Sequence, residues 1–144
     1  MSYALDTNVL LHAANADSPS HRVVRKLLER CARSDEPLCL TWGVISGFLR
    51  ISTHAALFQR PLSPEVAMNA VDELLDLPQT RVLVEEPGFW SAYRKVAKSV
   101  APRAKAVPDT HLAALLHLHG VRRLYTSDRD FRRFDFLEVV DPRA

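Results

Sequence analysis

Acidic side chains stand at three widely separated points of the sequence, each beside an apolar segment or a helix start. Asp6 follows the apolar residues 3–5, Asp109 stands where a late helix opens, and Asp128 comes two residues after the apolar residues 124–126. A parallel sheet would bring these strand ends together at one edge. Carboxylates clustered there repel one another and are hard to keep ionised without a cation. Oxygen ligands of this kind select Mg²⁺ or Mn²⁺, which can lower the pKa of a bound water and offset charge on a phosphodiester. A shared metal site of this kind would carry out metal-assisted hydrolysis, and Asp6, Asp109 and Asp128 are its candidate catalytic and metal-binding residues.

Helix capping is the competing interpretation for most of these acids. Asp109 stands where an N-cap would stand, and Asp128 and Asp130 could cap the short turn beside them. Asp6 has little structural reason to follow an apolar strand directly. Two polar residues come next and can orient its carboxylate by hydrogen bonding: Thr7 and Asn8.

Positive charge is concentrated in the second half of the chain. The formal net charge is only +2, but residues 87–133 hold 10 Lys/Arg against 3 Asp/Glu, a net of +7. A basic half on a near-neutral chain suggests a polyanion partner. Solvated helix faces explain the same charges equally well.

Short apolar segments alternate with longer amphipathic ones. Strands are expected at 3–5, 38–40, 81–84 and 124–126, with an edge strand at 136–140. Helices are expected at 7–14, 19–33, 42–54, 64–77, 89–100 and 109–119, with one helical turn at 129–131. This alternation predicts a parallel sheet of four to five short strands, covered by helices on both faces. The length of 144 residues fits one domain, residues 1–144.

Several protein classes are disfavoured by composition. No apolar run approaches about 18 residues, so no membrane span is expected. An Asp at position 6 does not fit a signal peptide, and two cysteines do not make a disulfide framework, so we expect a cytoplasmic protein. The spacing of His117 and His119 is wrong for a zinc site on one helical face.

Three acidic motifs resemble those of PIN domains, in the same order and at similar separations. The resemblance covers nearly the whole chain and is strongest to the VapC-type toxin ribonucleases of bacterial toxin–antitoxin pairs. It rests on Leu5-Asp6-Thr7-Asn8-Val9-Leu10-Leu11, Val107-Pro108-Asp109-Thr110-His111-Leu112-Ala113-Ala114 and Tyr125-Thr126-Ser127-Asp128-Arg129-Asp130-Phe131.

This resemblance implies a three-layer α/β/α fold and a Mg²⁺-dependent endoribonuclease that acts on RNA as a homodimer. It also implies a VapB-like antitoxin whose C-terminal segment blocks the active site. Asp6, Asp109 and Asp128 carry over as the acidic metal-site residues. Asp130 is carried over as an auxiliary acid, and Thr7 and Ser127 as hydrogen-bonding supports.

One position departs from the family pattern. The family has a Glu on the helix after the second strand, typically three residues before an Arg, and here Gly47 precedes Arg50 at that spacing. Glycine inside a helix costs about 1 kcal/mol relative to Ala, so either close packing or loss of the acid is needed to explain it. We hypothesise that the chain is an attenuated nuclease, or a catalytically impaired one that acts through antitoxin or RNA binding. Arg50 could pair with an active-site carboxylate or be solvated.

Two further alternatives stay open from the residues alone. Core or interface packing fits Trp42, Phe89 and Trp90 better than base stacking. A phosphotransferase with Asp6 as nucleophile is disfavoured because Asn8 stands where that class has a second Asp.

Overall fold

The central sheet of the protein has five parallel strands. The computed structural model describes residues 1–144, and its strands are β1 (Tyr3–Leu5), β2 (Leu38–Thr41), β3 (Thr80–Leu83), β4 (Arg123–Tyr125) and β5 (Glu138–Val140). Their order across the sheet is β3-β2-β1-β4-β5. All neighbouring strands are parallel. The expected sheet is confirmed, although the edge strand is shorter than the sequence predicted.

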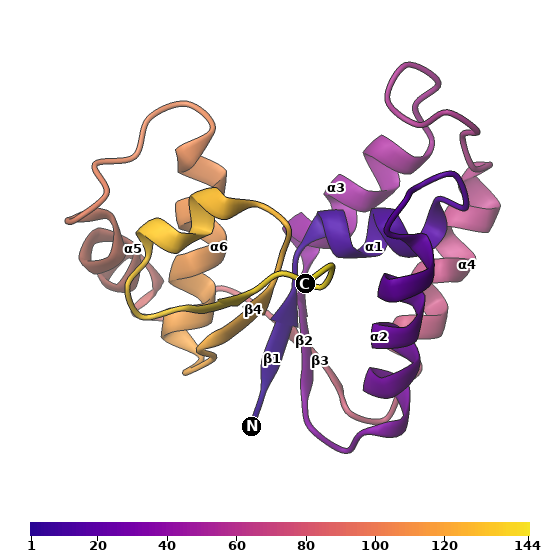
Figure 1. Cartoon of the computed structure of the whole chain (residues 1–144). Helices are drawn as coiled ribbons and strands as arrows, with labels where there is room; N and C mark the ends of the chain where they lie inside the picture. Colours follow the sequence, from indigo (N-terminus) through magenta and orange to yellow (C-terminus); the bar gives the residue numbers. More distant parts are fainter.

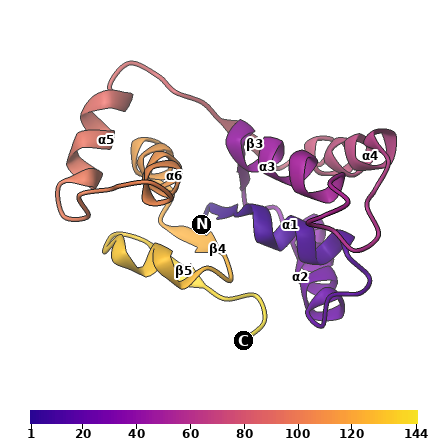
Figure 2. The ribbon, with the colours of Figure 1, turned by 90° about the horizontal axis from the view of Figure 1, so that it is seen from above.

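Helices cover both faces of this sheet, which makes three layers (Figures 1 and 2). One layer holds α1 (Thr7–Ala14), α2 (His21–Arg33), α3 (Trp42–Ser52) and α4 (Pro64–Leu75). The other holds α5 (Phe89–Ala97) and α6 (Ala106–Leu118), with the short 3₁₀ helix η1 (Arg129–Arg133) beside them. None of these helices combines the length and apolarity needed to cross a bilayer.

The strand β1 is central because its residues are apolar on both faces. Tyr3, Ala4 and Leu5 are all buried, which is the pattern of a strand covered by helices on both sides. Leu5 pairs with Tyr125 of β4, so the carboxyl ends of these two strands lie side by side. Functional groups of open parallel sheets gather at such strand ends.

Several expected helix boundaries are confirmed by their caps. Thr41 accepts a hydrogen bond from the Val44 amide, and Ser63 accepts one from the Val66 amide ahead of Pro64. Gly120 follows α6 with a positive φ of 71°, the left-handed conformation expected after a helix end.

Two helix starts differ from the prediction. The helix expected from Ser18 and Pro19 begins at His21, because Ser18 instead forms a turn in which its hydroxyl accepts the Ser20 amide. The helix expected at Asp109 begins at Ala106. Pro108 is tolerated there because the first amides of a helix have no intrahelical acceptor.

Candidate active site

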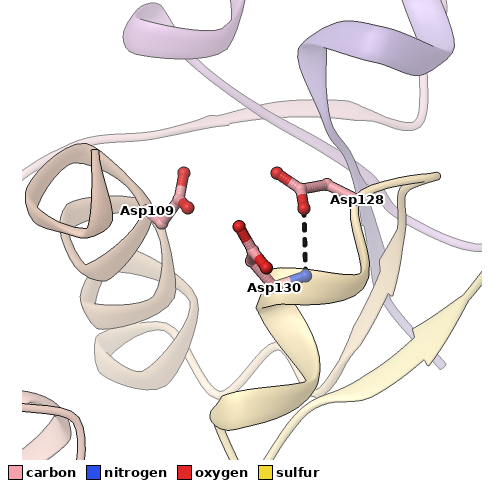
Figure 3. Close-up of side chains that lie close together, drawn as sticks. All are labelled: Asp109, Asp128 and Asp130. Atoms are coloured by element: carbon pink, nitrogen blue, oxygen red, sulfur yellow. Dashed lines mark hydrogen bonds between the residues drawn. The ribbon is translucent and has the colours of Figure 1, made fainter.

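The acidic residues predicted from the sequence meet at the carboxyl ends of β1 and β4. Asp6 follows β1, Asp128 is the N-cap of η1 after β4, and Asp109 lies in the first turns of α6. Carboxylate oxygens of Asp109, Asp128 and Asp130 lie within 4.8 Å of one another. Figure 3 shows the three side chains converging from α6 and η1. Asp6 does not belong to this close group, but it lines the same cavity as Asp109, so segments more than a hundred residues apart in sequence meet at this end of the sheet.

Asp6 is held by three hydrogen bonds. Its Oδ1 accepts from the Thr7 amide at 2.8 Å, and its Oδ2 accepts from Asn8 Nδ2 at 3.1 Å and Thr126 Oγ1 at 2.8 Å. Burial raises the pKa of Asp6, and these hydrogen bonds oppose that rise. Asp6 is also the N-cap of α1, so it has a structural reason that the sequence analysis did not find.

Thr126 joins the two strand ends, and the sequence analysis did not single it out. Its buried hydroxyl donates to Asp6 and accepts from Asn8 Nδ2 at 2.9 Å and from the Asp128 amide at 3.0 Å. Asn8 Oδ1 in turn accepts from the Ser127 amide at 3.0 Å. Ser127 therefore supports the site through its backbone, and Thr126 and Asn8 fix Asp6 and Asp128 relative to each other.

Asp109 is a partly buried carboxylate without a cap role. Its Oδ2 is buried and has no hydrogen-bond partner. Burial is the main cause that raises its pKa, and the neighbouring Asp128 raises it further. A buried carboxylate oxygen left unpartnered carries an electrostatic cost that a cation relieves. Since α6 begins at Ala106, Asp109 is not its N-cap, and the capping interpretation of Asp109 is wrong.

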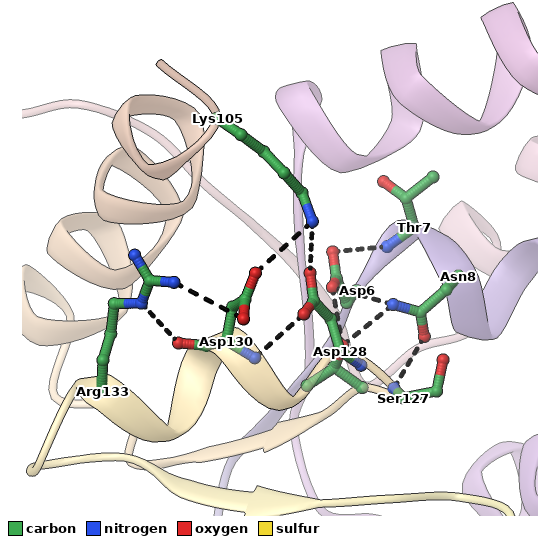
Figure 4. Close-up of polar contacts among 9 residues, drawn as sticks. Asp6, Thr7, Asn8, Lys105, Ser127, Asp128, Asp130 and Arg133 are labelled. Atoms are coloured by element: carbon green, nitrogen blue, oxygen red, sulfur yellow. Dashed lines mark hydrogen bonds and ion pairs between the residues drawn. The ribbon is translucent and has the colours of Figure 1, made fainter. Parts of the chain in front are cut away.

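Asp128 and Asp130 form the outer edge of the site with two basic side chains (Figure 4). Asp128 Oδ1 caps η1 by accepting the Asp130 amide at 2.9 Å. Lys105 Nζ lies 3.3 Å from Asp128 Oδ2 and 3.6 Å from Asp130 Oδ2. Arg133 Nη2 lies 3.5 Å from Asp130 Oδ1. The hydrogen bond to Asp128 raises the pKa of Lys105. No local pattern in the sequence distinguishes Lys105 from the other basic residues around it.

A cavity of about 300 Å³ opens beside the inner carboxylates. Asp6 and Asp109 line it together with Trp42, Glu85 and His111. The side chain of Trp42 is 55% exposed and that of Trp90 is 64% exposed. The prediction that these two tryptophans pack in the core is therefore wrong.

Gly47 faces the side chain of Thr7. A Cβ at position 47 would lie 3.0 Å from Thr7 Oγ1 and 3.3 Å from Thr7 Cγ2. The same Oγ1 donates to the Val44 carbonyl at 3.1 Å, so Thr7 links α1 to α3 across the space that glycine leaves. Arg50 is exposed and has no carboxylate within ion-pair distance, so the structure supports its solvated interpretation.

Comparison with known proteins gives the family of this site. The PIN domain model matches residues 3–137. The chain belongs to the PIN domain family. Ribonuclease VapC48 of Mycobacterium tuberculosis (strain ATCC 25618 / H37Rv) is 41% identical over 142 residues, which cover 99% of this chain and 98% of that protein. Ribonuclease VapC43 of the same strain is 40% identical over 138 residues, which cover 96% of this chain and 93% of that protein.

Solved structures share the PIN fold at lower identity. VapBC2 from Rickettsia felis, bound to a DNA fragment from its promoter, matches with a TM-score of 0.70 at 15% identity, over 97% of this chain and 98% of that one. Mycobacterium tuberculosis VapC20, described as a sarcin-ricin loop cleaving toxin, matches with a TM-score of 0.65 at 18% identity, over 90% and 92% of the two chains. The three-layer α/β/α fold is that of the PIN domain.

Proposed function

We propose that this PIN-domain protein is a divalent-metal-dependent endoribonuclease and the toxin of a type II, VapBC-like toxin–antitoxin pair. The observation that carries the proposal is the convergence of the predicted acids at one end of the sheet, in a chain whose relatives at 40–41% identity are named ribonucleases. The family match over residues 3–137 supports a single PIN-like domain over 1–144. The acids that lie within 4.8 Å of one another are Asp109, Asp128 and Asp130, and Asp6 lines the cavity beside them.

We assign the cation to the carboxylates of Asp6, Asp109 and Asp128, with Asp130 as an auxiliary acid. The unpartnered Oδ2 of Asp109 supports this assignment, since a bound cation would satisfy it. An all-oxygen set of carboxylates suits Mg²⁺ or Mn²⁺. When bound, such an ion lowers the pKa of a coordinated water and stabilises charge on the phosphodiester.

The remaining polar residues hold the acids in place. The carboxylate of Asp6 is kept in one orientation by three hydrogen bonds, which are donated by the Thr7 amide, the Asn8 side chain and the Thr126 hydroxyl. The Thr126 hydroxyl also anchors the backbone of Asp128. Such support fixes ligands before the substrate arrives, as an active site requires.

Basic residues on α5 and the loop that follows it suit the phosphates of RNA. Four basic side chains in this segment are exposed and have no carboxylate within ion-pair distance. Arg123 and Arg133, by contrast, each form an ion pair with an acidic side chain. Unpaired exposed cations are the ones free to bind phosphates, so binding should weaken steeply with added salt. The four unpaired basic residues are Arg94, Lys95, Lys98 and Arg103.

We infer two protein partners, a cognate VapB-like antitoxin and a second copy of the chain. VapBC complexes are among the proteins with this fold, and the cavity beside Asp6 and Asp109 is where an inhibiting antitoxin segment would act. A homodimer is supported by exposed apolar side chains, with Trp42 55%, Val84 41%, Trp90 64% and Val107 44% exposed. Because RNA and an antitoxin of this kind are cytoplasmic, we propose that the protein acts in the cytoplasm.

The proposed activity is tested by incubating purified protein with RNA in Mg²⁺, in Mn²⁺ and in EDTA. Cleavage should require the cation and should disappear in Asp128→Asn. Metal-independent cleavage, or equal cleavage by the variant, contradicts the proposal.

The second candidate is a catalytically impaired protein that binds antitoxin or RNA without cutting. The observation that favours it is Gly47, which faces Thr7 next to Asp6 and brings no carboxylate to the site. Full antitoxin binding together with no cleavage in either metal would favour this candidate over the first.

A further inference from the structure

The ammonium group of Lys105 lies against the outer carboxylates of the site. It is 3.3 Å from Asp128 Oδ2 and 3.6 Å from Asp130 Oδ2, while its side chain remains 72% exposed. Figure 4 shows it reaching from the start of α6 across to η1. Lys105 therefore contacts one oxygen of each of two carboxylates, Asp128 and Asp130, that could hold a divalent cation.

The backbone that presents Lys105 is strained. Ala101 and Ala104, in the loop between α5 and α6, have positive φ values of 49° and 48°. This left-handed conformation costs an alanine about 1 kcal/mol or more. Lys105 directly follows Ala104, so the strained turn sets where the lysine stem leaves the chain. Strain of this kind persists where the surrounding structure fixes a functional position.

We propose that Lys105 competes with the divalent cation for Asp128 and Asp130. Once the cation has displaced it, Lys105 binds a phosphate of the RNA. The inference rests on the nuclease function proposed above. A Mg²⁺ ion approaches carboxylate oxygens to about 2.1 Å. At that range it repels an ammonium group on the same oxygens, so the two cations exclude each other.

The chemistry of lysine fits both parts of this role. Its compact charge sits on a flexible four-carbon stem, so it can leave Asp128 without moving the backbone. Lysine is also a common phosphate ligand in proteins. Arg133 contacts the opposite oxygen of Asp130 and need not move with it.

The alternative is that Lys105 forms only a surface ion pair. An exposed pair contributes about 0.2–1 kcal/mol to stability. This alternative predicts that removal of the charge slightly lowers the thermal midpoint and changes Mn²⁺ affinity by less than about twofold, as at a lysine away from the site. The two interpretations thus predict different sizes of change in metal affinity.

The experiment is Mn²⁺ titration by calorimetry without RNA, on wild-type protein, Lys105→Gln, Lys105→Arg and Lys26→Gln. Lys26 is an exposed lysine of α2 that forms no ion pair, which makes it the matched control. Lys105→Gln should bind Mn²⁺ roughly threefold to tenfold more tightly than wild type. Lys105→Arg, which keeps the charge, and Lys26→Gln should both stay within about twofold of wild type.

A second readout uses RNA at saturating Mn²⁺. The KM of Lys105→Gln should rise roughly threefold or more, while kcat changes less, because a phosphate contact is lost. Equal or weaker Mn²⁺ affinity in Lys105→Gln overturns the competition, and an unchanged KM overturns the phosphate contact.

Failure of the proposed function can be recognised separately. If the wild type binds Mn²⁺ but cleaves no RNA, the nuclease proposal and the phosphate contact fail, while the titration still decides the competition. If neither the wild type nor Lys105→Gln binds Mn²⁺, both the competition and the metal-dependent function are overturned.

Discussion

A methyl group added at Gly47 tests how closely α1 and α3 approach each other beside the site. Gly47→Ala alone should gain about 1 kcal/mol from helix propensity. The added Cβ, however, would lie 3.0 Å from Thr7 Oγ1 and 3.3 Å from Thr7 Cγ2. Overpacking of this kind costs about 1–3 kcal/mol. A displaced Thr7 would also weaken its hydrogen bond to the Val44 carbonyl, worth about 0.5–1.5 kcal/mol.

The expected net effect is a loss of about 1 kcal/mol in the free energy of unfolding, because overlap outweighs propensity. In a Thr7→Ala background the obstructing atoms are gone, so Gly47→Ala should stabilise by about 1 kcal/mol. The two substitutions should therefore show a coupling energy of about 2 kcal/mol. Urea unfolding followed by circular dichroism of the four proteins measures it. If Gly47→Ala stabilises the wild type as much as it stabilises Thr7→Ala, the packing explanation of Gly47 is refuted.

Three further predictions concern the acids and their supports. Gly47→Glu should increase Mg²⁺-dependent RNA cleavage over both wild type and Gly47→Gln if the glycine attenuates the enzyme, and no gain would contradict attenuation. Thr126→Val should lower the free energy of unfolding by about 2–3 kcal/mol and reduce cleavage, because three hydrogen bonds converge on this buried hydroxyl. Thr110→Val is the matched control, since Thr110 is equally buried but donates only to the Ala106 carbonyl; equal losses in the two variants would exclude the supporting role. Asp109→Asn should raise the thermal midpoint of metal-free protein at neutral pH, because burial and Asp128 raise the pKa of Asp109 and make its ionised form unfavourable in the folded state. That gain should shrink as the pH falls below the raised pKa of Asp109, because the protonated carboxyl is uncharged, as asparagine is. A gain in thermal midpoint that does not change with pH argues against ionisation as the cause.

The sequence was sufficient to predict the sheet, the order of its elements and the acids at its strand ends. These features depend on local signals, such as the apolar run at 3–5 and the serine and proline that open α4. Convergence of Asp6 and Asp128 followed from one further rule, that parallel strands present their carboxyl ends at the same edge.

Features that depend on tertiary contacts were missed. The role of Thr126 arises only because β4 lies next to β1, which no local pattern shows. Lys105 is one cation among many in a basic segment, and only the turn before α6 brings it to the acids. The spacing of Trp42 predicted a helical face but not its exposure, because burial depends on what packs there.

Helix starts were missed for a related reason. A serine followed by proline at 18–19 has the form of a cap, yet the chain uses that serine in a turn before α2 begins. At α6 the residues before Pro108 carry no capping signal, so the helix was expected to start at Asp109. Because α6 begins at Ala106, Asp109 is not its N-cap, and its carboxylate faces the site instead.

The central claim is that acids from β1, α6 and η1 form one divalent-cation site. The most direct measurement is an anomalous difference map from crystals soaked in Mn²⁺. We predict a peak between the carboxylates of Asp109 and Asp128, within reach of Asp6, and no such peak in Asp109→Asn. A map without a peak among these residues, or with its strongest peak at another acidic cluster, would contradict the account.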